Sequence, residues 1–433
     1  MSNKLQPVRG THDILPDEFE KFSAVTGAAR ELATLHGFRE MATPIFEMTE
    51  VFSRSMGETS DVVSKEMFSF ETRGGESVCL RPEFTAGTAR AFISNGMQQN
   101  LPLKLFSTGA VFRYERPQKG RQRQFHQVNF EWLGDAGWQA DAEIILLAGH
   151  LLSMLSEEKF TLHINTLGDT DSREKYRAAL VAYLTPLADK LSDDSKRRLA
   201  QNPLRILDTK DAGDRELLKN APIMTDYLSE AAKARFASIC TVLQAEEKTL
   251  FQQIKIDPAL VRGLDYYTDT VFEFVANSGE LGAQNTVLAG GRYDGLIEQM
   301  GGKATPAIGF AAGVERLSML IPDDVEAEKS EKVIVLPFEE IAPSEVFSIA
   351  SLLRFGLYNI FPDLSLEIYW EGKLSKRLEK AVKNGATHAV ILSPEEMKNE
   401  VCIVKNLNTR TEQKIPLEDF EDDAKLEVIF GIE

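Results

Sequence analysis

The chain has 433 residues, with 49 lysines and arginines against 66 aspartates and glutamates, and a formal net charge of -17. This balance excludes a protein that holds nucleic acid by bulk positive charge. A hydrophobic fraction of 43% with 27% charged residues also excludes a disordered or fibrous chain. No apolar run approaches the roughly 20 residues that span a bilayer, and the first residues carry no signal-peptide core, so we expect a cytoplasmic protein with no membrane partner. Three scattered cysteines and six histidines predict neither disulfides nor a metal site held by a protein motif.

The N-terminal part of the chain predicts helices around an antiparallel sheet. Residues 20–36 have the pattern of an amphipathic helix, and an extended stretch follows through Pro44. Between residues 66 and 133, short β-rich runs alternate with glycine and charged turns, which favours antiparallel pairing over crossover connections. Residues 141–157 then predict a strong helix, followed by the strand-like run FTLHINTLG.

The remainder predicts three further regions. Long helical stretches over residues 171–250 indicate a helical insertion, after which β-rich character returns and ends in AIGFAAGVERLSMLI, a strand that runs into a helix. Gly309 and Gly313 suit close approach at the centre of a sheet. The polar stretch 321–332 marks a domain boundary, and the alternating strands and helices beyond it predict a small α/β domain with a largely parallel sheet. We therefore expect an α+β domain from residues 1–170 and 251–322, the insertion from 171–250, and the α/β domain from 331–433.

One hairpin concentrates positive charge. Residues 113–123 carry five cationic side chains and one glutamate, a local net charge of +4, between two predicted strands. The planar fork of arginine suits phosphate oxygens, so this loop could surround a triphosphate or the end of a nucleic acid. The alternative is a solvated hairpin tip, the common fate of a charged run.

The strand after this hairpin has a polar face. Period-2 alternation places Phe125, Gln127, Asn129 and Glu131 on one side and apolar residues on the other. An aromatic followed by three hydrogen-bonding groups predicts the lining of a pocket for a polar ligand. The alternative is an ordinary half-exposed strand that turns its polar side to water.

In LRPEFTAGTARAF, Arg81, Glu83 and Thr85 alternate onto one face of a predicted strand, and a helix is expected to begin near Ala86. Glu83 could bind a ligand ammonium, or it could be a capping or salt-bridged carboxylate.

Three further segments combine glycine, tyrosine and arginine. In VRGLDYYTDTVFE, Arg262 lies in an apolar run, and burying it demands an anion, either a bound phosphate or an internal carboxylate. In GGRYDGL, Tyr293 follows a glycine pair that lets the backbone approach a ligand. In GVERL, Arg316 stands at a predicted helix start, where anions are favoured. The chain has no GxxxxGKS/T loop, GxGxxG fingerprint or GxSxG elbow, so a nucleoside triphosphate would have to be held by arginines on an antiparallel sheet.

Together these segments resemble class II aminoacyl-tRNA synthetases and, among them, the histidyl-tRNA synthetase family, in a divergent bacterial branch. PVRGTHDILPDE resembles the N-terminal segment of the family, ATPIFE its dimer-interface motif, FRYERPQKGRQRQF its ATP-binding hairpin and GFAAGVERL the third class-defining motif. LVRGLDYYTDTVFE and GGRYDGL resemble two signatures specific to the histidine family. The resemblance implies a class II catalytic domain with a helical insertion, a C-terminal α/β anticodon-binding domain, and a homodimer.

The implied reaction has two steps. L-Histidine is activated with ATP, accompanied by Mg2+, to histidyl-adenylate, and the histidyl group then passes to the 3'-terminal ribose of tRNA(His). Arg113 and Arg262 are the implied catalytic residues, because they would bracket the histidine carboxylate and the ATP α-phosphate.

Matching positions imply three sets of binding residues. The histidine-binding set is Glu83, Phe84, Thr85, Arg113, Gln127, Glu131, Arg262, Tyr266, Tyr267 and Tyr293. Within it Glu83, Thr85 and Gln127 would hold the α-amino group, Glu131 and Tyr267 would read the imidazole, and Tyr266 and Tyr293 would close the pocket. The ATP-binding set is Arg113, Glu115, Arg121, Arg123, Phe125 and Arg316, with Glu115 at the adenine, Phe125 stacked on it, and Arg316 with Arg121 or Arg123 at the terminal phosphates. The implied tRNA-binding set is Arg116, Gln118 and Lys119.

Three positions depart from the family pattern: Phe84, where RPEGT is commoner, Asp269 in YYTDT, and Gln122, often an aromatic. They leave the histidine activation chemistry intact but affect which features of the tRNA end are expected to be recognised.

Two rival functions stay open. One is the non-catalytic regulatory subunit of the ATP phosphoribosyltransferase of histidine biosynthesis, which is expected to lack parts of the arginine set and the C-terminal domain. The other is a nucleotide-binding protein without tRNA, which the C-terminal domain would discriminate. There, the predicted helix 374–383 packs through Leu374, Leu378, Ala381 and Val382. Its cations could meet an RNA backbone or be plain solvated surface: Lys373, Lys376, Arg377, Lys380 and Lys383.

Overall fold

The computed structural model describes residues 5–57, 60, 62–118, 120–261, 266–277, 285–322 and 331–431. The predicted site residues Lys119 and Arg262 lie outside these ranges. The chain divides into two compact units, Met1–Pro322 and Asp323–Glu433. Among the described helices, none is both long enough and apolar enough to cross a membrane.

The first unit is built on an eight-stranded sheet with the order β1-β5-β6-β11-β10-β9-β7-β8. The central strands pair antiparallel, as the short turns predicted, while β1 pairs with β5 and β7 with β8 in parallel. The strands are β1 (Arg39–Glu40), β5 (Leu103–Phe112), β6 (Gln124–Leu133), β7 (Phe160–Thr166), β8 (Phe251–Ile256), β9 (Thr268–Val275), β10 (Thr286–Arg292) and β11 (Ala307–Gly313).

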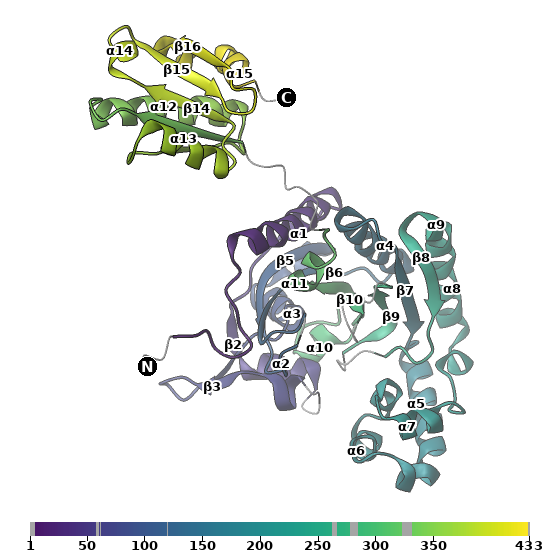
Figure 1. The fold of residues 1–433 in the computed structure, drawn as a ribbon. Helices are drawn as coiled ribbons and strands as arrows, with labels where there is room; N and C mark the ends of the chain where they lie inside the picture. Colours follow the sequence, from purple (N-terminus) through teal and green to yellow (C-terminus); the bar gives the residue numbers. More distant parts are fainter. Residues whose placement is uncertain are drawn as a thin grey trace. The chain divides into compact units, whose positions relative to one another are not determined.

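One face of this sheet packs on helices through an aromatic ladder. Phe106, Phe130 and Phe310 lie opposite one another on β5, β6 and β11, with ring centroids 4.9 and 4.8 Å apart. Each buried phenylalanine contributes about 1.5–3 kcal/mol of transfer free energy. The helices of the same core cluster are α1 (Pro16–Leu35), α4 (Trp138–Leu155), α8 (Glu230–Ala245) and α11 (Val314–Ser318), visible around the sheet in Figure 1.

Helices α1 and α4 each begin before their predicted first residue. Proline at N1 explains the earlier start of α1, because its fixed φ suits the first turn and its missing N–H would have no intrahelical partner there. Helix α1 buries Val25, Ala29 and Leu32 on one stripe, which is the amphipathic pattern expected of the sequence.

The opposite side of the unit carries a three-stranded sheet and shorter helices. The sheet order is β2-β4-β3. Its strands and the helices that pack beside it are β2 (Phe46–Met48), β3 (Ser69–Glu71), β4 (Ser77–Leu80), α2 (Thr49–Met56), α3 (Thr85–Ser94) and α10 (Leu296–Gln299).

The prediction that Arg81, Glu83 and Thr85 share a strand face is wrong. Strand β4 ends at Leu80, and Thr85 is the first residue of α3. Pro82 cannot donate to a strand ladder, which favours the end of the strand. Arg81 instead turns into the unit and donates to the carbonyl oxygens of Thr43 at 2.7 Å and Ala110 at 2.8 Å.

Residues 170–250 of the first unit are helical, and Figure 1 shows α5, α6 and α7 grouped together. Tyr176, Leu180, Leu184 and Ile206 form the centre of their own small core. Besides α8, the helices are α5 (Thr170–Leu184), α6 (Asp193–Gln201), α7 (Ala212–Leu218) and α9 (Glu247–Leu250), with 3-10 turns at Thr185–Lys190, Pro203–Asp208 and Met224–Tyr227. That they form a separate inserted domain remains a prediction.

The second unit is a five-stranded α/β sheet with the order β13-β12-β14-β15-β16. Strands β13, β12 and β14 are parallel, as the alternation of strands and helices predicted, and β15 and β16 add an antiparallel edge. The elements are β12 (Lys332–Pro337), α12 (Pro343–Ile360), β13 (Ser365–Ile368), α13 (Leu374–Lys383), β14 (His388–Leu392), α14 (Pro394–Met397), β15 (Val401–Asn406), β16 (Glu412–Pro416) and α15 (Asp423–Phe430). Sequence reasoning missed β16 and α15.

Helix α13 corrects two predictions about its faces. Val382 is 57% exposed and does not pack, whereas Arg377 is only 6% exposed. The Arg377 guanidinium donates to the carbonyl oxygens of Pro337 at 2.7 Å and Tyr369 at 2.8 Å. Because its hydrogen bonds lie inside the unit, Arg377 is not part of a cationic surface.

Candidate active site

The polar face of β6 is buried. Glu131 and Asn129 are each 1% exposed and Gln127 is 8% exposed, so the alternative of a strand face turned to water is wrong. Three side chains donate hydrogen bonds to the Glu131 carboxylate. Thr85 Oγ1 reaches Oε1 at 2.5 Å, Asn129 Nδ2 reaches the same oxygen at 2.9 Å, and the Tyr293 hydroxyl donates to Oε2. Residues from α3, β6 and the end of β10 therefore converge on one carboxylate.

Gly309 makes room for this carboxylate. It pairs with Glu131 across β11 and β6, and a Cβ atom at Gly309 would lie 1.9 Å from Glu131 Oε2 and 2.3 Å from the Phe130 carbonyl oxygen. Any side chain there would displace the carboxylate or the strand. The close approach predicted for Gly309 is thus present, and the group that Gly309 approaches is the Glu131 carboxylate.

Burial raises the pKa of Glu131 from 4.5 to about 7, although its three hydrogen-bond donors oppose the shift. Burial also raises the pKa of Glu83, and the backbone N–H groups at the start of α3 and the nearby Arg113 oppose it. Two buried carboxylates that are costly to ionise favour a ligand that brings positive charge or N–H donors.

Glu83 also has a structural role. Its Oε2 accepts from the Thr85 N–H at 2.6 Å and its Oε1 from the Ala86 N–H at 2.7 Å, so it satisfies the first turn of α3. Nearby, within the part of the chain that the structure describes, the buried oxygens Gln127 Oε1 and Asn129 Oδ1 have no hydrogen-bond partner. An unpartnered amide oxygen beside a carboxylate is suited to an ammonium group.

Aromatic rings border this chamber, which we define by Glu83, Gln127, Glu131, Tyr266 and Tyr293. The ring centroid of Tyr266 lies 4.8 Å from that of Tyr267 and 5.6 Å from that of Tyr293. Burial, reinforced by neighbouring acidic groups, raises the pKa of the Tyr266 and Tyr293 hydroxyls, which therefore stay neutral donors.

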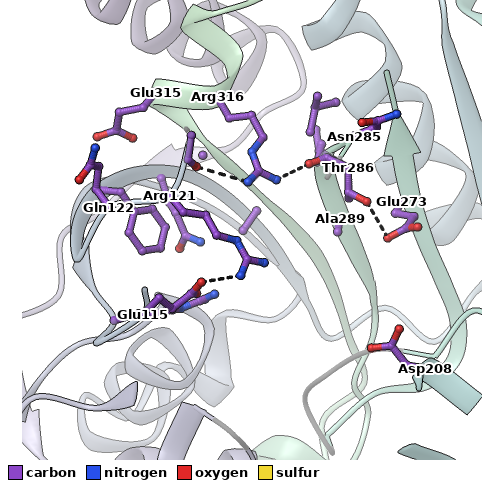
Figure 2. A pocket seen from close by; sticks show the side chains of 18 of the residues that line it. Glu115, Arg121, Gln122, Asp208, Glu273, Asn285, Thr286, Ala289, Glu315 and Arg316 are labelled. Atoms are coloured by element: carbon purple, nitrogen blue, oxygen red, sulfur yellow. Dashed lines mark hydrogen bonds and ion pairs between the residues drawn. The ribbon is translucent and has the colours of Figure 1, made fainter. Parts of the chain in front are cut away.

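A cavity of about 600 Å³ opens beside the chamber, and Arg121 and Arg316 are among the residues that line it (Figure 2). Arg121 pairs with Glu115 at 2.6 Å, and Arg316, the third residue of α11, donates to the Thr286 carbonyl oxygen at 2.5 Å and to the Gly120 carbonyl oxygen at 3.3 Å. Burial and the nearby Arg121 lower the pKa of Arg316. An anion between these guanidinium groups would relieve their mutual repulsion.

Arg113 connects the cavity with the chamber, because it lines the cavity and acts electrostatically on the Glu83 carboxylate. Gln127 also lines the cavity, and it lies on the same face of β6 as Glu131. Arg113 Nε donates to the Pro82 carbonyl oxygen at 2.9 Å, and its guanidinium carbon lies 5.5 Å from the ring centroid of Phe125, which also lines the cavity. This geometry fits a two-part ligand whose reacting centre lies at Arg113.

Other predicted site residues lie elsewhere. Phe84 is 1% exposed, and its ring centroid lies 4.2 Å from the Arg81 guanidinium carbon. Arg123 is absent from the cavity wall and packs against the N-terminal segment. Arg116 and Gln118 are exposed on the hairpin tip.

Sequence reasoning missed a group of cavity residues from the helical segment. Asp208, Lys210 and Arg215 line the cavity together with Glu273, Asn285 and Thr286. The run DTKDAGDR resembles an ordinary solvated turn, and no spacing in it indicates that it lies beside the hairpin. Only the tertiary fold brings these charges to the cavity.

A buried ion-pair network lies next to Tyr293 at one end of the chamber, and no local sequence pattern indicates it. Arg292 and Asp141 both have fully buried side chains, and Arg292 Nη2 donates to Asp141 Oδ2 at 2.5 Å while Arg235 Nη2 donates to the same oxygen at 2.6 Å. Asp269, one of the departures from the family pattern, faces this network, and burial raises its pKa. Its φ of 41° suits aspartate, which tolerates the left-handed region.

The first unit combines three features: an antiparallel sheet with a cationic hairpin, a glycine-spaced strand that leads into an arginine-bearing helix, and a buried polar chamber beside them. Together they define the catalytic unit of a class II aminoacyl-tRNA synthetase. The sequence profile of the histidyl-tRNA synthetase family matches residues 10–317. The chain therefore belongs to the histidyl-tRNA synthetase family.

Individual relatives agree with this placement. The chain is 51% identical over 421 residues to the histidine–tRNA ligase of Rhodospirillum rubrum, covering 96% of this chain and 98% of the relative. It is 48% identical over 416 residues to that of Gluconobacter oxydans, covering 96% and 97%. The crystal structure of apo histidyl-tRNA synthetase from S. aureus superposes with a TM-score of 0.79 at 30% identity, covering 98% of this chain and 100% of that one.

A structure from Bacillus halodurans, described as an ATP phosphoribosyltransferase regulatory subunit/histidyl-tRNA synthetase, has a TM-score of 0.62 at 22% identity and covers 88% of this chain and 97% of that one. At this identity the similarity demonstrates a shared fold alone.

Proposed function

We propose that this chain is a histidine–tRNA ligase, which forms histidyl-adenylate from L-histidine and ATP and transfers the histidyl group to tRNA(His). The observation that carries the proposal is the buried Glu131, held by three donors beside unpartnered amide oxygens and joined through Arg113 to the arginine-bordered cavity. The chamber takes the amino acid and the cavity takes the nucleotide.

In the proposed complex, the acceptors of the chamber read both ends of histidine. Glu83 and Gln127 Oε1 accept from the α-ammonium group, with the Thr85 hydroxyl beside them, and Glu131 accepts an imidazole N–H. The Tyr266 and Tyr293 rings enclose the imidazole, and Tyr267 contacts it together with Glu131. A site that must hydrogen-bond a ring nitrogen penalises isosteres without that group, because its own buried polar groups would be left unpaired.

The activation step needs positioning and cationic stabilisation. The histidine carboxylate attacks the α-phosphorus, the bond between that phosphorus and the α,β-bridging oxygen breaks, and the β- and γ-phosphoryl groups leave together as pyrophosphate. Arg113, at the junction of chamber and cavity, holds the two anions together, while Arg121 and Arg316 bind the leaving pyrophosphate. Glu115 and Phe125 contact the adenine. Arg262 belongs to the same predicted catalytic set but lies outside the described residues.

Mg2+ would enter with ATP. Among the described residues, no group of three or more His, Cys, Asp or Glu side chains could hold a metal ion. Mg2+ commonly binds nucleotide phosphates with only one or two carboxylates, and Glu273 and Glu315 line the cavity, so the residues fit the ion. When bound, Mg2+ would neutralise phosphate charge.

The tRNA would meet both units. Arg116 and Gln118 are exposed on the hairpin tip, at the entrance expected for the acceptor end. Lys119 belongs to the same predicted tRNA-binding set but lies outside the described residues. The α/β unit of residues 331–433 would bind the anticodon. If a chain truncated after Pro322 charged tRNA as well as the full chain, the anticodon assignment would be wrong.

An exposed apolar edge supports a homodimer. Strand β2 is an edge of the three-stranded sheet, and Ile45, Phe46, Met48 and Phe70 are each 41% to 59% exposed. Edge strands with exposed apolar side chains readily pair with another chain. Replacing Phe46 with Glu should shift the sedimentation coefficient to that of a monomer, and an unchanged coefficient would contradict the assignment. The cytoplasmic location remains a prediction from the sequence.

Near-full-length relatives at about 50% identity carry the name histidine–tRNA ligase, and Arg113, Arg121 and Arg316 line the cavity, so the ligase is favoured over a regulatory subunit. The test is exchange of labelled pyrophosphate into ATP with each amino acid in turn, followed by charging of total tRNA. Exchange should depend on histidine, and charging should label one isoacceptor group. A soundly folded chain that exchanges with no amino acid would refute the ligase.

A further inference from the structure

The two arginines that flank Gln122 take different partners. Arg121 lines the cavity and pairs with Glu115, whereas Arg123 is directed to the N-terminal segment. Arg123 Nη1 donates to the Arg9 carbonyl oxygen at 3.3 Å, and Nε donates to the Glu115 carbonyl oxygen at 3.3 Å. The Arg123 guanidinium carbon lies 3.7 Å from the ring centroid of Tyr114. The Arg123 guanidinium, which the resemblance places at the ATP phosphates, is thus stacked on Tyr114 and hydrogen-bonded to two carbonyl oxygens.

The backbone of Arg123 makes the same connection. Its N–H donates to the Gly10 carbonyl oxygen at 2.6 Å, and its carbonyl oxygen accepts from the Arg113 N–H at 2.9 Å. Arg113 is the residue at the junction of chamber and cavity. A continuous set of hydrogen bonds therefore runs from the N-terminal segment through Arg123 to Arg113.

The N-terminal partner is a tight turn over residues 8–11. The Thr11 N–H and Oγ1 both donate to the Val8 carbonyl oxygen, at 2.9 and 2.8 Å, and Gly10 at the third position has a φ of 88°. A positive φ at this position is the requirement that glycine meets in a type II turn. A Cβ atom at Gly10 would lie 2.8 Å from Arg123 Cγ and 3.0 Å from Pro117 Cγ, so the turn touches the hairpin closely.

We propose that Arg123 is a positioning residue that holds the cationic hairpin against the turn at residues 8–11, and that this turn is a functional part of the nucleotide site. Arg121 and Arg316 bind the phosphates; Arg123 fixes the loop that presents Arg121 and Glu115. The inference rests on the proposed binding of ATP in the cavity.

The test uses the full-length chain and approaches the contact from both sides. The variants are Gly10→Ala, Arg123→Met, Arg123→Lys and the double variant Gly10→Ala with Arg123→Met. Gly37→Ala is the matched control, because Gly37 also has a positive φ, of 74°, but a Cβ atom there would meet nothing within 4 Å. ATP affinity is measured by calorimetry without histidine, and hydrogen exchange is followed at the amides of Arg113 and Arg123.

Gly10→Ala and Arg123→Met should each weaken ATP binding by about tenfold, within the range by which a misplaced binding group lowers function. The double variant should bind ATP no more than about twofold more weakly than either single variant, because both substitutions disrupt the same contact. Lysine should not restore affinity, because it lacks the planar fork that stacks and donates to two carbonyl groups. Amide exchange at Arg113 and Arg123 should speed up in Gly10→Ala and not in Gly37→Ala.

The opposite pattern would overturn the proposal. If Arg123 bound phosphate, Arg123→Lys would retain most of the affinity as a point charge, and Gly10→Ala would bind ATP like Gly37→Ala. The proposed ligase activity fails separately: it would be contradicted if the unsubstituted chain bound ATP but showed no histidine-dependent pyrophosphate exchange. The role of Arg123 could then still be tested, because the variants are compared by their ATP affinity.

Discussion

The chamber around Glu131 and the cavity between Arg121 and Arg316 are neighbours built on different principles. The chamber is built on α3 and β6, and the Glu131 carboxylate already accepts hydrogen bonds from a side chain of each and from Tyr293, the residue after β10. The cavity combines sheet residues with the hairpin loop, and its cations Arg121 and Arg316 are held by one carboxylate and by backbone carbonyl groups. The chamber is therefore preorganised for one small ligand shape, while the cavity offers charge to a flexible polyanion. Changes on the two sides should have separable effects.

Replacing Arg316 with Met should have the largest effect. It removes a half-buried cation from the cavity, and the rate of histidine-dependent pyrophosphate exchange should fall about 1000-fold, near 4 kcal/mol of transition-state free energy. Histidine affinity, measured by calorimetry without ATP, should stay within about twofold of the unsubstituted chain. Comparable losses on both measurements would mean that chamber and cavity are not independent.

The pH dependence of stability should identify Glu131. Its pKa is raised to about 7 in the folded chain, so the folded state holds a proton that the unfolded state releases near pH 4.5. Folding stability from this group should therefore decrease as pH rises from about 4.5 to 7 and then level off, with a total loss of up to about 3 kcal/mol. The difference in unfolding free energy between the unsubstituted chain and Glu131→Gln, measured from pH 5 to 8, should show this decrease. Parallel curves would contradict the assignment.

Glu131→Gln should act on the amino acid and spare the nucleotide. The KM for histidine should rise about 30-fold, near 2 kcal/mol, because a charge-assisted acceptor for the imidazole is lost. The KM for ATP should change little, and discrimination against close histidine analogues should weaken in exchange assays. A variant that still rejected those analogues would be incompatible with imidazole recognition by Glu131.

Tyr293→Phe should have the smallest effect of this series. It removes one of three donors to Glu131 and leaves the ring in place, so the KM for histidine should rise about fivefold, near 1 kcal/mol. Losing that donor should also raise the pKa of Glu131 further, which moves the pH dependence of histidine binding upward. If that dependence stayed in place, the Tyr293 hydroxyl would not act through the carboxylate.

Sequence reasoning succeeded where a short-range pattern has a single geometric consequence. The alternation from Phe125 to Glu131 places one set of side chains together whatever the rest of the fold does, and GVERL after glycine-spaced residues places Arg316 at a helix start. It failed for Arg81 because Pro82 ended the strand that the alternation assumed.

Charge alone could not assign partners. The sequence left Arg377 either to an RNA backbone or to solvent, and the resemblance implied that Arg123 binds ATP. In the structure both guanidinium groups donate to carbonyl oxygens of other segments. Lys210 and Arg215 join the cavity only because residues about 90 positions after the hairpin fold back toward it. These choices depend on tertiary distances, which no local pattern contains.

The aromatic ladder of Phe106, Phe130 and Phe310 guards against register errors. Phe130 and Glu131 are adjacent, so a slip of β6 by one residue would turn the carboxylate into the apolar core and the phenylalanine into the ligand chamber. Such a misaligned sheet would lose its aromatic contacts and bury an unpartnered acid at once. The same strand pairing that completes the hydrophobic core therefore aligns the Glu131 carboxylate with its hydrogen-bond donors, so folding of the core also assembles the chamber proposed to bind the amino acid.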